Sequence, residues 1–364
     1  MSYNARRKQA VAAARKAGID ALLITHLPDV RWLCGFTGSN AAVVLSKSAG
    51  TRPILITDGR YTAQARSEAV GVKVIIAPKS AVIAACEWMA QAGIKRCGFD
   101  DGNTTVATLK QMQAAVAAKL RRSMFQAVGS LVSTLRWIKD SDEIVSMRAV
   151  AALGCRLFDS VLTHIVPGTT EAEVALALEY EAKLAGASEM SFPSIVASGP
   201  RSALPHGRAS SAKLPARGFV TLDFGVVLDG YCSDMTRTVH LGRASAEEQR
   251  VYEAVLEAQQ AGIAAVRAGV TGGDVDEAAR SVLRRAKLDK WFTHSTGHGV
   301  GLEIHEGPRL AARQTQKLEA GMVVTIEPGV YMPGKFGVRI EDMVLVTRTG
   351  SEILTPSTKA WIEL

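Results

Sequence analysis

The sequence has no long hydrophobic run, and no segment approaches the ~20 consecutive apolar residues that a membrane-spanning helix needs. We therefore expect no membrane partner. The amino-terminal stretch MSYNARRKQAVAAARKAGID is charged throughout and lacks the apolar core of a secretory signal. It leads directly into the apolar ALLIT, so we expect it to form a first helix rather than an export signal.

Cysteine is scarce, and its spacing does not suggest pairs. The five cysteines are an odd number with no two close together: Cys34, Cys86, Cys97, Cys155 and Cys232. This pattern argues against a disulfide framework and indicates reduced thiols, as in a cytosol. We therefore expect a cytoplasmic protein.

Motifs of nucleic-acid binding are also missing, although the charge is uneven. Residues 1–140 carry 20 Lys and Arg against 8 Asp and Glu, a net charge of +12, whereas the whole chain carries +8. A basic half is compatible with binding to nucleic acid or to an acidic surface. No basic stripe interleaved with aromatic residues accompanies it, so a solvated basic face or a subunit contact is favoured, and we expect no nucleic-acid partner.

What is present suits a two-domain α/β protein, since 364 residues with 47% hydrophobic composition can bury a substantial core. From about residue 20 to 128, the strand-like runs ALLIT, AAVVL, PILIT and VKVIIA alternate with helical stretches, which predicts an α/β layer domain. We expect a first domain over residues 1–130 and a second over 131–364. In the second, Asp140 with Glu143 three residues on predicts the start of a long helix.

A weak internal repeat follows in the second domain. Residues 168–174 and 269–275 share the pattern G-x-T-x-x-acid-V, in which each Thr and its acid form a capping box that opens a helix. Such boxes are common enough for the match to arise by chance. If the repeat is real, the second domain consists of two similar halves.

Two acidic pairs stand in otherwise apolar strand-like runs, where a lone carboxylate is costly to bury. In VTLDFGVVLDGYCSD these are Asp223 and Asp234, and a tight turn at Asp229-Gly230 would set Asp223 opposite Thr236 with Asp234 on the same face. The repeat predicts a counterpart of this strand pair near residues 322–347.

That counterpart region carries Glu327 and Glu341 in MVVTIEPGVY and GVRIEDMVLV. In the second run, Arg339 and Glu341 alternate with Val338 and Ile340, which puts the polar pair on one face. Two pairs of like charges converging in an apolar setting repel one another unless cations lie between them.

Histidines cluster near these acids, because five of the seven lie within residues 206–305 and three of them within THSTGHGVGLEIHEGP. Four carboxylates with an imidazole and without a thiolate form a hard donor set, suited to Mn, Co, Zn or Mg. Two divalent ions would balance four carboxylates. Such paired ions sit ~3.5–4 Å apart and activate a water between them.

A resemblance now becomes specific. The segments LDFG, DMTRT, GHGVGLEIHE, TIEPGVY and VRIED resemble the pita-bread metallopeptidases, the superfamily of methionine aminopeptidase, prolidase, aminopeptidase P and creatinase, and contain in order Asp223, Asp234, His298, Glu327 and Glu341. WLCGFTGS and TDGRY resemble the creatinase-like first domain of prolidases and aminopeptidases P, and RSALPHG resembles a segment of the proline-specific branch. Creatinase itself lacks the five ligands.

The resemblance implies a fold and a metal centre. The fold would be an amino-terminal creatinase-like α/β domain followed by a pita-bread catalytic domain with α+β, pseudo-twofold architecture. Asp223 would bind one ion and His298 with Glu327 the other, while Asp234 and Glu341 would bridge them. The resemblance favours two manganese ions, with cobalt or zinc as alternatives.

It also implies catalytic roles. Glu327 would take the proton of the attacking water and pass it to the leaving nitrogen, and His206 and His305 would hydrogen-bond the substrate and the oxyanion. Arg339 would pair with a ligand carboxylate or hold the shape of the site. His294 is assigned to substrate binding and is the weakest member of the set.

The function implied is hydrolysis of the Xaa-Pro bond at the amino terminus of short proline-containing peptides, with Xaa-Pro dipeptidase (prolidase) first and aminopeptidase P as the alternative. A non-catalytic pita-bread protein that binds a protein or RNA partner is a third reading, which the intact ligand set disfavours. By resemblance alone we also expect a homodimer and a first domain that covers the mouth of the site.

Overall fold

The computed structural model describes residues 2–46 and 52–364 and divides the chain into two compact units, Met1–Arg136 and Trp137–Leu364. The unit boundary lies slightly after the one expected at residue 130, because the helix α6 (Leu131–Arg136) belongs to the first unit. Among the helices in these described ranges, none is both long and apolar enough to cross a bilayer.

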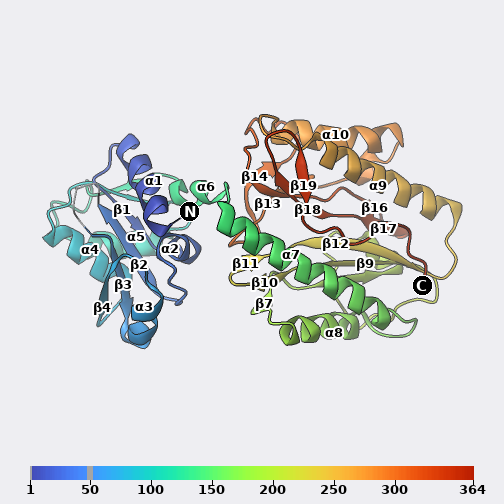
Figure 1. Cartoon of the computed structure of the whole chain (residues 1–364), viewed down its shortest axis with the longest axis horizontal. Helices are drawn as coiled ribbons and strands as arrows, with labels where there is room; N and C mark the ends of the chain where they lie inside the picture. Colours follow the sequence, from blue (N-terminus) through green and yellow to red (C-terminus); the bar gives the residue numbers. More distant parts are fainter. Residues whose placement is uncertain (1, 47–51) are drawn as a thin grey trace. The chain divides into compact units, whose positions relative to one another are not determined.

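The first unit is built on one sheet whose strands run in the order β4-β3-β2-β1-β5-β6 (Figure 1). In chain order its elements before α6 are α1 (Tyr3–Lys16), β1 (Ala21–Ile24), α2 (Leu27–Cys34), β2 (Ala41–Ser46), β3 (Ile54–Asp58), η1 (Gly59–Tyr61), α3 (Thr62–Glu68), β4 (Lys73–Ala77), α4 (Ala81–Gln91), β5 (Cys97–Phe99), α5 (Val106–Ala114) and β6 (Phe125–Ala127). The four runs predicted as strands form β1 to β4, and the amino-terminal stretch forms α1, so these predictions are confirmed. Met89 of α4 and Met112 of α5 are buried against the sheet, as an α/β layer requires.

The second unit consists of two helices and a run of strands, followed by two more helices and a second run of strands. Its elements are α7 (Ser141–Val161), η2 (Leu162–His164), α8 (Glu171–Leu184), β7 (Glu189–Met190), β8 (Ile195–Ser198), η3 (Gly199–Ala203), β9 (Gly218–Phe224), β10 (Val226–Leu228), β11 (Tyr231–Cys232), β12 (Met235–Leu241), α9 (Ala246–Ala265), α10 (Gly272–Arg285), η4 (Asp289–Trp291), β13 (Gly297–Gly299), β14 (Glu306–Leu310), β15 (Val323–Ile326), β16 (Gly329–Met332), β17 (Phe336–Arg339), β18 (Asp342–Val346) and β19 (Ser351–Ile353).

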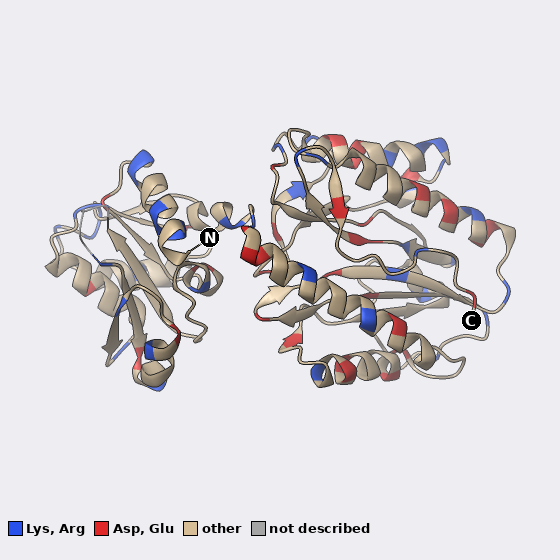
Figure 2. Cartoon of the chain, viewed as in Figure 1, with Lys and Arg blue, Asp and Glu red and all other residues tan. Residues whose placement is uncertain are grey.

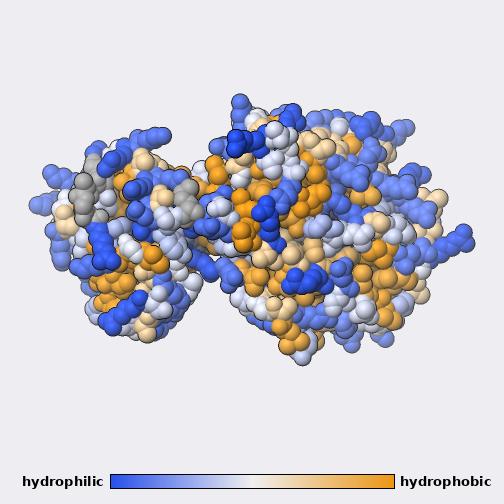
Figure 3. Space-filling model, viewed as in Figure 1, coloured by the Kyte–Doolittle hydropathy of each residue, from blue (hydrophilic) through white to orange (hydrophobic). Residues whose placement is uncertain are grey.

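Helix pairs enclose the strands of this unit (Figure 1). One apolar cluster joins α7 and α8 to β8, β9 and β12, and two others join α9 and α10 to β15 through β18. Charged residues lie mainly on helices and loops while the strands are mostly uncharged (Figure 2). On the face shown in Figure 3, hydrophilic and hydrophobic residues are mixed on the surface of each unit. The central strands β9, β12, β15 and β18 therefore lie in the interior between the helix pairs.

The internal repeat is real in three dimensions. Thr170 with Glu173 and Thr271 with Asp274 form the predicted capping boxes at the starts of α8 and α10. The loop before each box also repeats. The N–H of Gly168 donates to the carbonyl oxygen of Leu214, and the N–H of Gly269 donates to the carbonyl oxygen of Leu318. The predicted capping box of Asp140 and Glu143 at the start of α7 is present as well.

The first strand pair has the predicted register. Asp229 and Gly230 have φ of 48° and 76°, the left-handed conformation of a tight hairpin turn, and Asp223 pairs with Thr236. The ladder breaks at Gly225, where an added Cβ would lie 1.8 Å from the carbonyl oxygen of Ser233. Asp234 stands at this break.

The second strand pair breaks in the same way. The pairs Ile326–Asp342 of β15–β18 and Gly329–Arg339 of β16–β17 keep one continuous register. Glu327 is therefore set across from Glu341 in the interruption between the two ladders. Both halves thus present carboxylates where regular backbone pairing stops, as the repeat predicted.

Replacing Thr271 by Ala should destabilise the second unit by about 1 kcal/mol, because the substitution removes the side-chain acceptor at the start of α10. A shift of the urea midpoint followed by circular dichroism measures this loss. Thr271→Ser keeps the hydroxyl and serves as the control. Equal losses in the two variants would contradict the capping role.

Candidate active site

One cavity of about 780 Å³ in the second unit gathers the candidate residues named from the sequence. The members of that set that line it are His206, Asp223, Asp234, His294, His298, His305, Glu327, Arg339 and Glu341. The cavity wall also includes apolar side chains, among them Phe192 and Ile195. A pocket of this size with converging polar groups is typical of a small-molecule or peptide site.

The five candidate ligands come from both halves of the repeat. Asp223 lies in β9 and His298 in β13, whereas Asp234, Glu327 and Glu341 lie between strands. Within a regular strand, side chains alternate between the two faces of the sheet. Because these three residues lie outside the ladders, the backbone can turn their carboxylates toward one point. The structure therefore brings the residues of the sequence-derived set together.

Three of them approach one another closely enough to share an ion. One carboxylate oxygen each of Asp234 and Glu341 and one ring nitrogen of His298 all lie within 4.8 Å of one another. His298 Nε2 is 3.5 Å from Asp234 Oδ2 and 3.5 Å from Glu327 Oε1, while its Nδ1 is 3.0 Å from the carbonyl oxygen of Gly299. The carbonyl oxygen accepts a hydrogen bond from the protonated Nδ1, which leaves the lone pair of Nε2 available to bind a metal ion.

Burial and mutual repulsion dominate the electrostatics of these acids. Burial, followed by the charges of Glu341 and Asp223, raises the pKa of Asp234 well above its usual value. The pKa of Glu341 rises for the same reasons, through burial and then the charges of Glu327 and Asp223. Burial, with a contribution from Asp223, raises the pKa of Glu327 to about 8. Nearby cations would relieve this repulsion.

The donor set fits divalent cations. It offers carboxylate oxygens and one imidazole, while Cys232 lies in an apolar cluster outside the cavity lining, where burial raises its thiol pKa to about 12. Hard ions such as Mn²⁺, or borderline ions such as Co²⁺ and Zn²⁺, match these donors. Burial also lowers the pKa of His298 to about 4, so its ring is neutral and able to ligate at pH 7.

Arg339 is the buried cation next to the acids. Its Nη2 is 2.5 Å from Asp223 Oδ2, and its Nε donates to Thr236 Oγ1 at 3.1 Å. The Thr236 hydroxyl in turn donates to Glu341 Oε2 at 2.6 Å. Arg339 and Thr236 therefore fix the orientation of one carboxylate from each half.

Tyr331 links this group to His294. Arg339 Nη1 donates to the Tyr331 hydroxyl at 2.6 Å, which leaves the hydroxyl proton for His294 Nε2 at 2.9 Å. His294 Nδ1 is 2.8 Å from the carbonyl oxygen of Ser295, and burial lowers the pKa of His294 to about 4. His294 is thus a neutral ring held at both nitrogens.

Sequence reasoning missed Tyr331 and Thr236. A signal existed for Thr236, which the turn at Asp229-Gly230 already placed opposite Asp223. The pairing of Tyr331 with Gly337, two residues from Arg339, is visible only in the structure. The role of Thr236 depends on its contact with Glu341, which is 105 residues away in the sequence and which strand alternation alone does not predict.

The two other histidines lie on loops of the cavity wall. His206 follows η3, and His305 immediately precedes β14. The ring of His305 meets that of His298 edge to face at 4.4 Å between centroids, and partial burial lowers its pKa. His305 can therefore offer a neutral N–H to a bound substrate.

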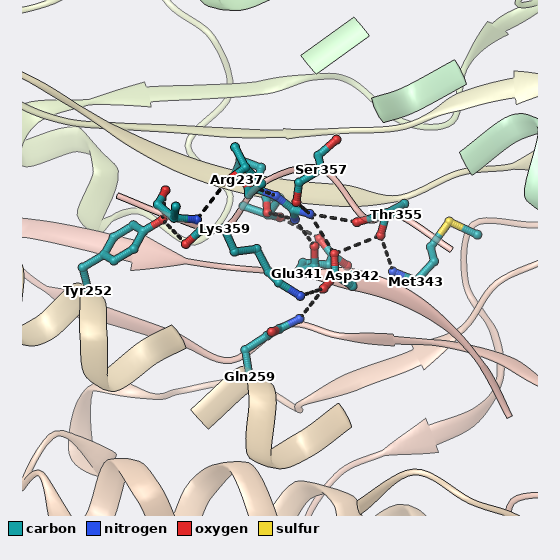
Figure 4. Close-up of polar contacts among 12 residues, drawn as sticks. Arg237, Tyr252, Gln259, Glu341, Asp342, Met343, Thr355, Ser357 and Lys359 are labelled. Carbon is teal, nitrogen blue, oxygen red and sulfur yellow. Dashed lines mark hydrogen bonds and ion pairs between the residues drawn. The ribbon is translucent and has the colours of Figure 1, made fainter. Parts of the chain in front are cut away.

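A buried polar network supports Glu341 from behind (Figure 4). Arg237 donates to the Glu341 carbonyl oxygen at 2.5 Å and to Asp342 Oδ1 at 2.8 Å. It also donates to the carbonyl oxygens of Thr355 and Ser357, so it joins the carboxy-terminal segment to the strand pair. These contacts fix the backbone on the carboxyl side of Glu341.

Comparison with known proteins follows the same division of the chain. The model of metallopeptidase family M24 matches residues 145–348, and that of the creatinase/prolidase N-terminal domain matches residues 6–138. The chain belongs to metallopeptidase family M24. The resemblance found in the sequence is confirmed, and so is the fold of a creatinase-like domain followed by a pita-bread catalytic domain.

Relatives of this M24 metallopeptidase cover nearly its whole length. The peptidase YqhT of Bacillus subtilis is 41% identical over 347 residues, covering 95% of this chain and 96% of the relative. The structure named Xaa-Pro dipeptidase from Bacillus anthracis is 39% identical with a TM-score of 0.95, covering 100% of both chains. The X-Pro aminopeptidase from Thermotoga maritima is 34% identical with a TM-score of 0.88, covering 97% of this chain and 100% of that one.

Adding Mn²⁺ to metal-free protein should raise the unfolding temperature, and more at pH 8 than at pH 6. At pH 6, below the pKa of about 8 for Glu327, protons compete with the ion for the carboxylates. A carboxyl whose pKa is higher in the folded chain also makes the metal-free fold less stable as pH rises through that pKa, which the ion would offset. A free Mn²⁺ concentration of 100 times Kd would raise the free energy of unfolding by about 2.7 kcal/mol.

Differential scanning fluorimetry at the two pH values, together with metal analysis of the dialysed protein, measures this effect. The double variant Asp234→Asn, Glu341→Gln provides the control because it removes two of the three clustered donors. A shift of the same size in that variant would show that the ion binds elsewhere.

Proposed function

We propose that this metallopeptidase is an Xaa-Pro dipeptidase with a two-metal centre. The observation that carries the proposal is that four carboxylates from two interrupted hairpins line one cavity with His206 and His305, and that three of them, Asp234, Glu327 and Glu341, lie close to His298. Two divalent cations would neutralise that charge.

The proposed ligand assignment uses both halves of the repeat. Asp223 would hold one ion, His298 and Glu327 the other, and Asp234 and Glu341 would lie between them. When bound, the ions would polarise the scissile carbonyl and lower the pKa of the attacking water. Manganese is the first choice, with cobalt and zinc as alternatives that suit the same donors.

The protein side chains would then handle the proton and the developing charge. Glu327 would accept the proton of the attacking water and pass it to the leaving nitrogen. His206 and His305 would donate hydrogen bonds to the substrate and to the oxyanion. Arg339 would keep Asp223 in place, and His294 would contact the substrate from the opposite end of the Tyr331 link.

The substrate assignment rests on the relatives and on the chemistry of proline. Structures similar to this one are named Xaa-Pro dipeptidase and X-Pro aminopeptidase, and prolidases of Pyrococcus species have the same fold. The bond before proline has no N–H and a restricted backbone, so its cleavage calls for a dedicated site. Aminopeptidase P, which accepts longer peptides, is the alternative. The complete donor set disfavours a non-catalytic role in binding protein or RNA.

Three further parts of the proposal concern the setting of the enzyme. The five free thiols suit a reducing compartment such as the cytoplasm. A homodimer is proposed from the family resemblance. The first domain would restrict access to short peptides.

Manganese-loaded protein should release free alanine from Ala-Pro and much less from Ala-Pro-Ala. An assay of free alanine over time on both peptides measures the ratio. Comparable or faster cleavage of the tripeptide would make the protein an aminopeptidase P. Cleavage of neither would refute the proline-specific assignment.

Tyr331→Phe should lower kcat for the preferred peptide by about tenfold or more, because Arg339 and His294 both lose their shared partner. Tyr252→Phe is the matched control, since Tyr252 is also buried but donates to a backbone carbonyl outside the cavity. Steady-state kinetics of the two variants measure the difference. Equal kcat values would exclude a role for the Tyr331 hydroxyl.

A further inference from the structure

Glu171 is a fully buried carboxylate outside the cavity lining. It is the first residue of α8, and its side chain is 0% exposed. Burial of a carboxylate is costly unless hydrogen bonds compensate it. Its partners therefore indicate why it is there.

The side-chain partners of Glu171 all lie in one segment, which runs from Ser198 at the end of β8 through η3 to Ser210 and is called the His206 loop below. Oε1 accepts from the backbone N–H of Ser198 at 2.8 Å and from its hydroxyl at 3.0 Å. Oε2 accepts from the backbone N–H of Ser210 at 3.2 Å and from its hydroxyl at 2.7 Å. Arg201 Nε donates to both oxygens, at 3.2 and 3.0 Å. Both ends of the loop between Ser198 and Ser210 are thus tied to one carboxylate.

This loop carries His206. Arg201 also connects Glu171 to the interior of this loop, because its Nη2 donates to the carbonyl oxygen of Arg208 at 3.0 Å. At the cavity, Arg339 Nη1 donates to the carbonyl oxygen of Pro205 at 3.1 Å. His206 therefore lies next to Pro205, whose carbonyl oxygen contacts Arg339, in a loop whose two ends Glu171 holds together.

The carboxylate is not needed to cap α8. Thr170 and Glu173 already form the capping box at that helix end. Glu171 instead gains from the positive end of the helix while its oxygens face the loop. We propose that Glu171 is a positioning residue for His206: it fixes the loop that presents this histidine to the substrate. The inference rests on the proposed role of His206 in Xaa-Pro hydrolysis.

Glu171→Gln tests the proposal with little change in volume. One carboxylate oxygen becomes an NH₂ group that faces donors, so one end of the loop loses its acceptor. We expect kcat for Ala-Pro hydrolysis by the manganese-loaded full-length protein to fall about 10-fold to 100-fold, the scale of a small misplacement of a catalytic group. Metal content should stay at the wild-type level, since Glu171 is outside the candidate ligand set.

The control and the decisive comparison use other residues. Glu173→Gln alters the same helix turn, where the Glu173 carboxylate accepts from the N–H and hydroxyl of Thr170 rather than from the loop, and should leave kcat near the wild-type value. In a His206→Ala background, Glu171→Gln should cause no further loss of kcat, because both changes remove the same function. Losses that multiply, or an equal loss in Glu173→Gln, would overturn the proposal.

A second variant and a second readout keep the test independent of folding and of substrate. Ser210→Ala removes one hydroxyl donor, so it should cause a smaller loss that also vanishes in the His206→Ala background. In ¹³C-histidine NMR spectra, the signal that His206→Ala removes should broaden or split in Glu171→Gln while that of His305 is unchanged. An unchanged His206 signal would refute the positioning role even if Ala-Pro proves not to be the substrate.

Discussion

The mutual repulsion of buried carboxylates is the constraint on which the second unit is organised. Burial and neighbouring acids raise the pKa values of Asp234 and Glu341, so the metal-free fold favours their protonated forms, and their ionised forms require a nearby cation. Arg339 compensates part of that charge through Asp223, and its position is fixed in turn by Tyr331 and Thr236. The residual negative charge is what makes the site a receptor for cations.

The internal repeat meets this constraint by bringing two interrupted hairpins together. Each break frees a carboxylate from strand alternation, and hydrogen bonds then join the breaks across the halves. The Glu341 N–H donates to the Thr236 carbonyl oxygen, and the Thr238 hydroxyl donates to that of Arg339. Arg237 adds a third connection, from β12 to the Glu341 carbonyl. The site is therefore a property of the joint between halves, and neither half contains it alone.

Much of this could be predicted from sequence because the signals are local. Alternation and the Asp229-Gly230 turn gave the register that places Asp223 opposite Thr236, and the capping boxes gave the repeat. The three-residue strands β5 and β6 and the helix α2 were not predicted, since such short segments carry too little periodicity. Tyr331 and Glu171 were missed for another reason: their partners are chosen by tertiary packing, and nothing in their own segments identifies them.

The loops that complete the cavity depend on buried polar groups that do not line it. Glu171 ties the His206 loop, and in the second half Asp276 accepts from the Thr296 N–H and hydroxyl while Arg280 donates to the His294 carbonyl oxygen. These anchors differ in their positions on α8 and α10, so they are parallel solutions rather than copies of one repeat motif. A loop held by a satisfied buried carboxylate has few alternative conformations, because each would leave donors unpaired. Rigid presentation of histidines by otherwise irregular backbone follows from that penalty.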